Sequence, residues 1–271
     1  MSVHHAVPRV TVPKLQERAR AGEKLVMLTC YDASFAAISE AAGVDLLLIG
    51  DSLGMVVQGR DSTLAVKLED TEYHVRCVAR GSERALVIAD LPFLSGFQAS
   101  PERAFRAASR MLAAGAQMVK LEGGAHMAEA TRFLVDRGIP VCAHIGLTPQ
   151  LVNTLGGYRV QGRDETAAAR VLDEARRLED AGAFSVVLEL VPAELAARVT
   201  EALSIPTIGI GAGAGCSGQV LVLPDLLGLN DRFAPKFLKR YGTMGDDVRA
   251  AVRRFAGEVR DGSYPDADHS F

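Results

Sequence analysis

The chain has 271 residues, of which 48% are hydrophobic and 23% are charged, and its formal net charge is −3. This composition is that of an ordinary globular protein, and the scattered basic residues give no reason to expect binding to nucleic acid or to an anionic membrane. The sequence shows no apolar run near the roughly 20 residues of a membrane span, no signal-peptide pattern, and no cysteine spacing typical of disulfides or zinc. We therefore expect a cytoplasmic protein.

Apolar segments alternate with amphipathic ones along the whole chain. Residues 1–10 are expected to be a flexible N-terminal arm, and residues 12–21 a short helix that ends at Gly22. Strands are predicted at residues 24–29, 45–50, 85–89, 117–122, 140–144, 184–188, 205–210 and 220–223. Helices are predicted at residues 33–42, 69–80, 101–114, in the segment up to Arg137, at 165–181, from Ala193 onward and at 246–260, with longer loops at 55–68 and 145–163.

This alternation predicts the fold class. Short apolar strands that alternate with helices favour parallel pairing through right-handed crossovers. About eight such units in roughly 250 residues are typical of an α/β protein with a (β/α)8 TIM barrel. An open doubly wound sheet is the alternative, and the lack of a GxGxxG pattern after the first strand disfavours it. We expect a single (β/α)8 catalytic domain over residues 11–271, with an extra N-terminal helix.

Polar side chains follow several of the predicted strands at their carboxyl ends. In α/β barrels the catalytic groups come from these ends. The residues concerned are Asp51, Ser52, Asp90, Lys120, Glu122, His144 and Glu189. Lys120 and Glu122 are two residues apart on one strand, so both face the same side, and Val119 and Leu121 face the other. The charged side is therefore predicted to be the barrel interior near its rim.

Each of these residues also has a structural interpretation. Asp51 and Asp90 could cap helices or form turns, and Lys120 could be only the salt-bridge partner of Glu122. Three carboxylates that converged without a cation would repel one another, which favours the functional interpretation of the acidic residues.

Three features stay open from the residues alone. His144 could be an ordinary core histidine with satisfied hydrogen bonds. Glu189 could be a structural carboxylate paired with an arginine. The glycines at 209–213 could bind a phosphate group, as in some barrels, or only allow close backbone packing.

The residue types indicate a definite chemistry. Carboxylate oxygens favour Mg²⁺ or a similar hard cation over zinc. A 2-oxo acid could chelate such a cation, which would act as a Lewis acid while a neighbouring C–H is deprotonated. Lys120 would place positive charge near the developing enolate oxygen, and Glu189 could take the proton.

Seven segments, in this order, resemble the signature motifs of the ketopantoate hydroxymethyltransferase family. They are Ile49-Gly-Asp-Ser-Leu-Gly54, Ala89-Asp-Leu-Pro-Phe93, Met118-Val-Lys-Leu-Glu-Gly-Gly124, His144-Ile-Gly-Leu-Thr-Pro-Gln150, Gly156-Gly-Tyr-Arg-Val-Gln-Gly-Arg163, Leu188-Glu-Leu-Val-Pro192 and Ile208-Gly-Ile-Gly-Ala-Gly213. The resemblance covers about residues 12–271. It implies a (β/α)8 barrel, a cytoplasmic homodecamer built as a pentamer of dimers, and a role in pantothenate biosynthesis.

The resemblance also implies a reaction and a set of roles. The reaction moves a one-carbon unit from 5,10-methylenetetrahydrofolate to 3-methyl-2-oxobutanoate and gives 2-dehydropantoate, with Mg²⁺ as cofactor. Asp51, Asp90 and Glu122 would form the metal group, directly or through water. The residues that bind the oxo acid would be Asp51, Ser52, Asp90 and Lys120, with His144 lining the site. Glu189 would be the catalytic proton acceptor, and the loop at 145–163 is a candidate for folate contacts.

The sequence departs from the family pattern after Gly213. Ser217 and Pro224 stand where the family commonly has an acidic residue and a histidine, which leaves any role of that segment at the rim open. Two other functions remain to be separated from the transferase. One is a Mg²⁺-dependent lyase or mutase similar to the isocitrate lyase group, although the Lys-x-Cys-Gly-His type of loop is absent from the sequence. The other is a barrel that binds a small acid without turning it over.

Overall fold

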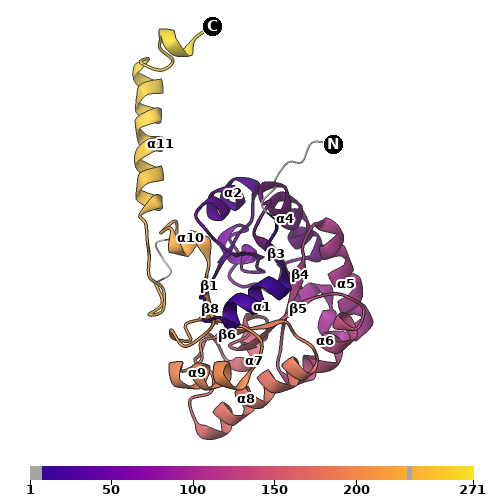
Figure 1. The fold of residues 1–271 in the computed structure, drawn as a ribbon. Helices are drawn as coiled ribbons and strands as arrows, with labels where there is room; N and C mark the ends of the chain where they lie inside the picture. The colour runs from indigo at the N-terminus through magenta and orange to yellow at the C-terminus, as the bar shows by residue number, and fades with distance from the viewer. Residues whose placement is uncertain (1–7, 231–233) are drawn as a thin grey trace. The chain divides into compact units, whose positions relative to one another are not determined.

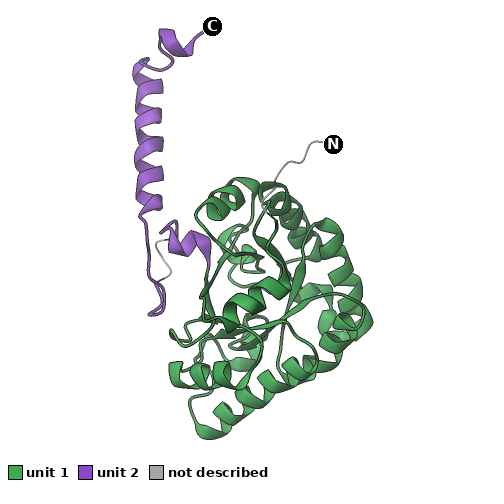
Figure 2. Cartoon of the chain, viewed as in Figure 1, with its two compact units in different colours: residues 1–221 green, residues 222–271 purple. Residues whose placement is uncertain are grey.

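A computed structural model describes residues 8–230 and 234–271 of the chain. It contains two compact units, residues 1–221 and residues 222–271 (Figure 2). The single domain expected over residues 11–271 remains a prediction. Most of the arm expected at residues 1–10 lies outside the described residues, because these begin at residue 8.

The first unit is a closed barrel of eight parallel strands in sequential order (Figure 1). The strands are β1 (Leu25–Thr29), β2 (Leu46–Ile49), β3 (Leu86–Asp90), β4 (Met118–Glu122), β5 (Val141–Gly146), β6 (Ser185–Glu189), β7 (Thr207–Ile210) and β8 (Gly218–Leu221). The (β/α)8 barrel is thereby confirmed, and the open doubly wound sheet is excluded. The last strand begins at Gly218 rather than at Val220, because Gly218 already pairs with Leu25 of β1 and Ile208 of β7.

Helices connect most of the strands around the outside of this barrel (Figure 1). Those of the first unit are α1 (Val12–Arg20), α2 (Ala33–Ala41), α3 (Leu53–Val56), α4 (Leu68–Gly81), α5 (Pro101–Ala114), α6 (Ala128–Val135), α7 (Val152–Leu155), α8 (Glu165–Asp180) and α9 (Ala193–Ala202). Several begin at side chains that accept a hydrogen bond from a free backbone N–H of the first turn, as Asp32 does from Phe35 and Asp164 from Ala167. The short helices α3 and α7 lie at or within segments predicted as loops.

The strands separate two apolar cores. Alternate strand residues face opposite sides, so one set fills the barrel and the other packs against the helices. The inner set includes Leu46, Ile88 and Met118, and the outer set includes Leu47 and Val119. Buried apolar side chains therefore line both the inside and the outside of one closed sheet.

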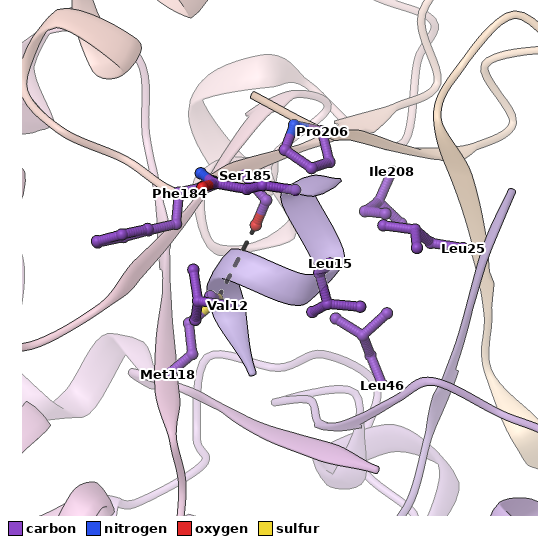
Figure 3. A pocket seen from close by; sticks show the side chains of 10 residues that line it. Val12, Leu15, Leu25, Leu46, Met118, Phe184, Ser185, Pro206 and Ile208 are labelled. Atoms are coloured by element: carbon purple, nitrogen blue, oxygen red, sulfur yellow. Dashed lines mark hydrogen bonds between the residues drawn. The ribbon is translucent and has the colours of Figure 1, made fainter. Parts of the chain in front are cut away.

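Helix α1 closes the amino-terminal end of the barrel, as expected for the extra N-terminal helix. Figure 3 shows this helix among the apolar side chains at the amino ends of the strands, with Leu15 beside Leu46. Leu15 is buried within the inner core. Arg18 Nη1 lies 2.6 Å from Asp45 Oδ1, and Asp45 Oδ2 accepts a hydrogen bond from the backbone N–H of Val26. One buried carboxylate thus joins α1 to the start of β1.

The second unit contains α10 (Leu223–Leu226), α11 (Met244–Asp261) and a 3-10 turn at Ala267–His269. The helix predicted at residues 246–260 is confirmed as α11. Within the unit, the backbone N–H of Tyr241 donates to Leu226 O over 2.8 Å. No helix formed by the described residues of the chain is long and apolar enough to cross a membrane.

Candidate active site

The alternation along the strands sends the predicted polar residues into the barrel at its carboxyl end. Lys120 and Glu122 continue the inward-facing series that begins at Met118, and Asp90 continues the series of Ile88. The register then places unlike groups next to each other, with Asp90 beside Lys120 and Glu122 beside His144. The prediction that the charged side of β4 faces the barrel interior is confirmed.

The end of β2 forms one wall of this site. Asp51 is buried, and its backbone N–H donates to Asp90 Oδ2 over 2.9 Å. Ser52 Oγ lies 2.8 Å from the hydroxyl of Tyr31, which follows β1. A Cβ atom at Gly50 would lie 2.7 Å from Ser52 Oγ, so glycine is needed for this close approach.

Lys120 stands at the centre of the buried charges. Its Nζ lies 2.7 Å from Asp90 Oδ1 and 3.5 Å from Glu122 Oε1. Burial alone would lower the pKa of Lys120, but the charges of Asp90, Glu122 and Asp51 outweigh it and raise the pKa. The surrounding carboxylates therefore favour the cationic form of Lys120.

His144 connects the carboxylates near Lys120 with Glu189. Its Nδ1 lies 3.3 Å from Glu122 Oε1 and 3.1 Å from Lys120 Nζ, and its Nε2 lies 3.1 Å from Glu189 Oε2. Burial and the Lys120 charge lower the pKa of the imidazole, but Glu122 and Glu189 raise it more, to about 9. Burial likewise opposes the ionisation of Glu122, yet Lys120 and His144 lower the pKa of this carboxyl to about 2.

The pKa of Asp51 reflects its burial and the neighbouring carboxylates of the site. Burial, followed by the charges of Glu122 and Asp90, raises the pKa of Asp51 well above its ordinary value. Four carboxyl groups, on Asp51, Asp90, Glu122 and Glu189, face two cationic side chains. A further cation would stabilise the ionised form of Asp51.

The donor chemistry fits a hard divalent cation, because the available ligands are carboxylate oxygens. Among residues 8–230 and 234–271, no three His, Cys, Asp or Glu side chains are arranged as a complete metal-binding group. One oxygen of Asp90 lies within ion-pair distance of Lys120, and one of Glu122 accepts from a backbone N–H. The convergence of the buried carboxyl groups of Asp51, Asp90 and Glu122 is the observation that supports a cation here.

Glu189 lies at the edge of the buried group. Its side chain is 18% exposed, whereas that of Glu122 is 2% exposed, so Glu189 is more open to solvent and substrate. The next residue, Leu190, has a backbone φ of 46°, which residues other than glycine rarely adopt. Its backbone N–H donates to Ile210 O, and its carbonyl accepts from Gln161 N. An unusual backbone conformation beside the carboxylate is typical of functional sites.

Sequence reasoning missed three residues of this site. Tyr31 contacts Ser52, and its position directly after a strand could have revealed it. The side chain of Tyr158, at the end of the loop after β5, lies close enough to Glu189, Asp51 and Glu122 that burial and these charges raise its pKa. Gln150 contacts two of the carboxylates. Both Tyr158 and Gln150 lie inside the family motifs His144–Gln150 and Gly156–Arg163, but no pattern of residue types assigned them a role.

The segment after Gly213 differs from the expectation. Ser217 precedes β8 and therefore lies at the amino-terminal end of the barrel, not at the rim of the site. There its N–H donates to Thr207 Oγ1, and its Oγ accepts from Thr207 N. The glycines at 209–213 allow close packing, because a Cβ atom at Gly213 would lie 2.5 Å from that of Ala193.

The comparisons with known sequences agree on one protein family. The sequence model described as ketopantoate hydroxymethyltransferase matches residues 9–267. A relative from Thiobacillus denitrificans, named 3-methyl-2-oxobutanoate hydroxymethyltransferase, is 60% identical over 97% of this chain and 99% of its own. A relative from Burkholderia ambifaria, named 3-methyl-2-oxobutanoate hydroxymethyltransferase 1, is 56% identical over 97% of each chain.

Comparison with solved structures supports the fold. The barrel is similar to 2,3-dimethylmalate lyase, a member of the PEP mutase/isocitrate lyase superfamily, with a TM-score of 0.59. The two share 20% sequence identity, and the match covers 97% of this chain and 93% of the lyase. At this identity the similarity concerns the barrel architecture and not the activity.

Proposed function

The chain belongs to the ketopantoate hydroxymethyltransferase family, and from this premise we propose the course of its reaction. Hydroxymethyl transfer to 3-methyl-2-oxobutanoate follows from the family. We propose that 5,10-methylenetetrahydrofolate supplies the one-carbon unit, that Mg²⁺ is required, and that the product is 2-dehydropantoate for pantothenate synthesis.

One observation carries the proposal. Buried carboxylates surround a buried lysine at the carboxyl end of the barrel, and they leave Asp51 with a raised pKa. Such an arrangement is unfavourable for an empty structural core but suits a site that receives a cation together with an acidic substrate.

Asp51, Asp90 and Glu122 would hold the cation, directly or through water. When bound, Mg²⁺ would supply Lewis-acid polarisation of the keto oxygen of the oxo acid. Lys120 adds a fixed positive charge near the same oxygen, held in place by Asp90. Asp51, Ser52 and Asp90 would bind and orient the oxo acid, with His144 lining the site.

Glu189 is the proposed base. It would take the proton from C3 of the oxo acid, and the electron pair of the broken C–H bond would form the C2–C3 double bond of the enolate. C3 would then form a bond to the one-carbon unit carried by the folate. Water would supply the hydroxyl group of the product as the bond between this carbon unit and the folate breaks. His144 keeps Glu189 in position through the contact of its Nε2 with Glu189 Oε2.

Three further parts of the proposal concern the surroundings of the site. The loop at 145–163 is proposed to contact the folate, because its Tyr158 is half-exposed and close to the carboxylates. We also propose a cytoplasmic location and a homodecamer built as a pentamer of dimers. Sedimentation of the purified protein as a species smaller than a decamer would contradict the assembly.

The test is a coupled assay of the full chain with 3-methyl-2-oxobutanoate, 5,10-methylenetetrahydrofolate and Mg²⁺. We expect 2-dehydropantoate to form, and EDTA to stop its formation. Turnover that persists after chelation would contradict the metal requirement. Binding of the oxo acid without product or C3–H exchange would instead favour a binding barrel, and turnover of phosphonopyruvate would favour a lyase or mutase.

A further inference from the structure

Gln150 is a buried amide that contacts two carboxylates from different strands. It lies in the 3-10 turn Pro149–Leu151, within the loop after β5. Its side-chain Nε2 donates to Asp51 Oδ2 over 2.9 Å, and its backbone N–H donates to Glu122 Oε2 over 3.0 Å. Asp51 and Gln150 are 99 positions apart in the sequence, so this contact exists only in the folded chain.

The orientation of the Gln150 amide is determined by its neighbours. Nε2 also donates to Leu91 O over 3.0 Å, so both of its hydrogens point at acceptors. Oε1 lies on the other side, where it accepts from Gln98 Nε2 over 3.3 Å. Reversing the amide would place its oxygen against two other oxygens, so only a side chain with a donor at this position suits the site.

The loop that carries Gln150 is also joined to the strand of the proposed base. The backbone N–H of Leu147 donates to Glu189 O over 2.8 Å. Gly146 has a φ of 89°, and a Cβ atom there would lie 2.4 Å from Glu189 O, so the loop leaves β5 in close contact with β6. The loop is therefore joined to β6 at Glu189 O, and Gln150 extends from this loop to Asp51 and Glu122.

We infer that Gln150 is a positioning residue that orients Asp51 and Glu122 for the divalent cation. The inference rests on the proposed function, because it assumes that these carboxylates serve the cation. Gln150 neutralises no charge. It directs one oxygen of each carboxylate toward a fixed donor, which sets the direction of the other. Partners of this kind orient metal ligands, and their loss typically lowers metal affinity about 10–100-fold.

The experiment measures Mg²⁺ binding directly, by titration calorimetry of the full chain in the presence of 3-methyl-2-oxobutanoate. The variant is Gln150→Met, which keeps the length of the side chain and removes the donor. The matched control is Gln117→Met. Gln117 is a partly buried glutamine whose side chain bonds two backbone groups, Val87 N and Gly115 O, but it lies at the start of β4, away from the site.

We expect Gln150→Met to raise the dissociation constant of Mg²⁺ about 10–100-fold and Gln117→Met to leave it unchanged. Turnover of Gln150→Met should recover as the Mg²⁺ concentration is raised, whereas purely structural damage would lower kcat at every Mg²⁺ concentration and overturn the inference. If Gln150→Met does not fold, Gln150→Asn serves in the same titration, because it keeps the amide but withdraws it from Asp51.

Two other results are decisive. Normal Mg²⁺ affinity in both Gln150 variants would overturn the role of Gln150 and leave the proposed function standing. Failure of the unmodified chain to bind Mg²⁺ in the presence of the oxo acid would overturn the proposed cation site, and the role of Gln150 with it.

Discussion

The two ends of the barrel are lined by the same strands but differ completely in chemistry. At the amino end, Leu25, Leu46 and Met118 pack against Leu15 of α1 in an apolar core. At the carboxyl end, the same inward-facing series reach Lys120 and Glu122, which are equally buried. A few residues along one strand therefore separate a region held by packing from a region held by charge.

The difference shows where stability and chemistry reside in this fold. Inside the barrel at its amino end, the packed side chains are uncharged, so the fold is destabilised there mainly when volume is removed. The charged end depends on each of its partners, since removing one leaves another buried without compensation. Three substitutions test this contrast, and a fourth tests a hydrogen-bonded carboxylate outside both regions; they follow from the largest expected effect to the smallest.

Lys120→Met should have the largest effect. It leaves Asp90 and Glu122 buried without their common cation, so the free energy of unfolding should fall by about 3–5 kcal/mol and turnover should be lost. Urea unfolding measures the first effect. The control is Lys14→Met, which breaks an exposed pair with Glu17 and should change stability by less than about 1 kcal/mol. Equal effects of both substitutions would remove the contrast between buried and exposed charge.

Glu189→Gln should separate activity from stability at the charged end. We expect proton exchange at C3 of the oxo acid, followed by NMR in D₂O without folate, to slow by about 10²–10⁴-fold. Stability should change little, because the amide oxygen can still accept from His144. Glu201→Gln, on the exposed surface of α9, should behave like the unmodified protein. Full exchange by the Glu189 variant would show that another group is the base.

Leu15→Ala, at the apolar end, should lower stability and leave activity unchanged. Removal of this buried side chain leaves a cavity under α1, and the free energy of unfolding should fall by about 2–5 kcal/mol. Turnover at 25 °C should remain, because the charged residues lie at the other end of the strands. Ile38→Ala, at a position 63% exposed on α2, serves as the control with a small effect. Loss of turnover in a folded Leu15 variant would show that the two ends are coupled.

Glu40→Gln should give the smallest effect, visible in the pH dependence of stability. Burial raises the pKa of Glu40, but hydrogen bonds from Ala85 N, Ser82 Oγ and two further backbone N–H groups outweigh it and lower the pKa. Because the pKa is lower in the folded state, the ionised carboxylate stabilises the fold above the unfolded pKa of 4.5. This stabilisation is lost as the pH falls through the folded-state pKa. The variant should be less stable by about 1–3 kcal/mol at pH 7.

Thermal unfolding at several pH values checks this prediction. The difference between the two proteins should shrink as the pH falls below 4.5, because the unfolded-state carboxyl of Glu40 takes up a proton there while the folded-state carboxyl takes it up only at its lower pKa. A difference that stays constant with pH would mean that the carboxylate charge contributes nothing.

Much of the fold could be predicted from the sequence, because strand and helix periods are local properties. The alternation of elements indicated a barrel, and the spacing of Lys120 and Glu122 indicated which side of β4 faces inward. The short helices α3 and α7 were missed because four residues are too few to show a helical period. Ser217 was assigned to the rim together with the segment after Gly213, although it precedes β8 and therefore lies at the amino end of the barrel.

The sequence by itself determined which charged residues reach the carboxyl end of the barrel. The alternation of side chains along each strand and the order of the strands decide this. Only the tertiary structure decided how they pair. The bridge of His144 between Glu122 and Glu189, and the contact of Gln150 with Asp51, join segments that are remote in the chain. Barrel register and the path of the loop after β5 bring these groups together, and neither is a local property of the sequence.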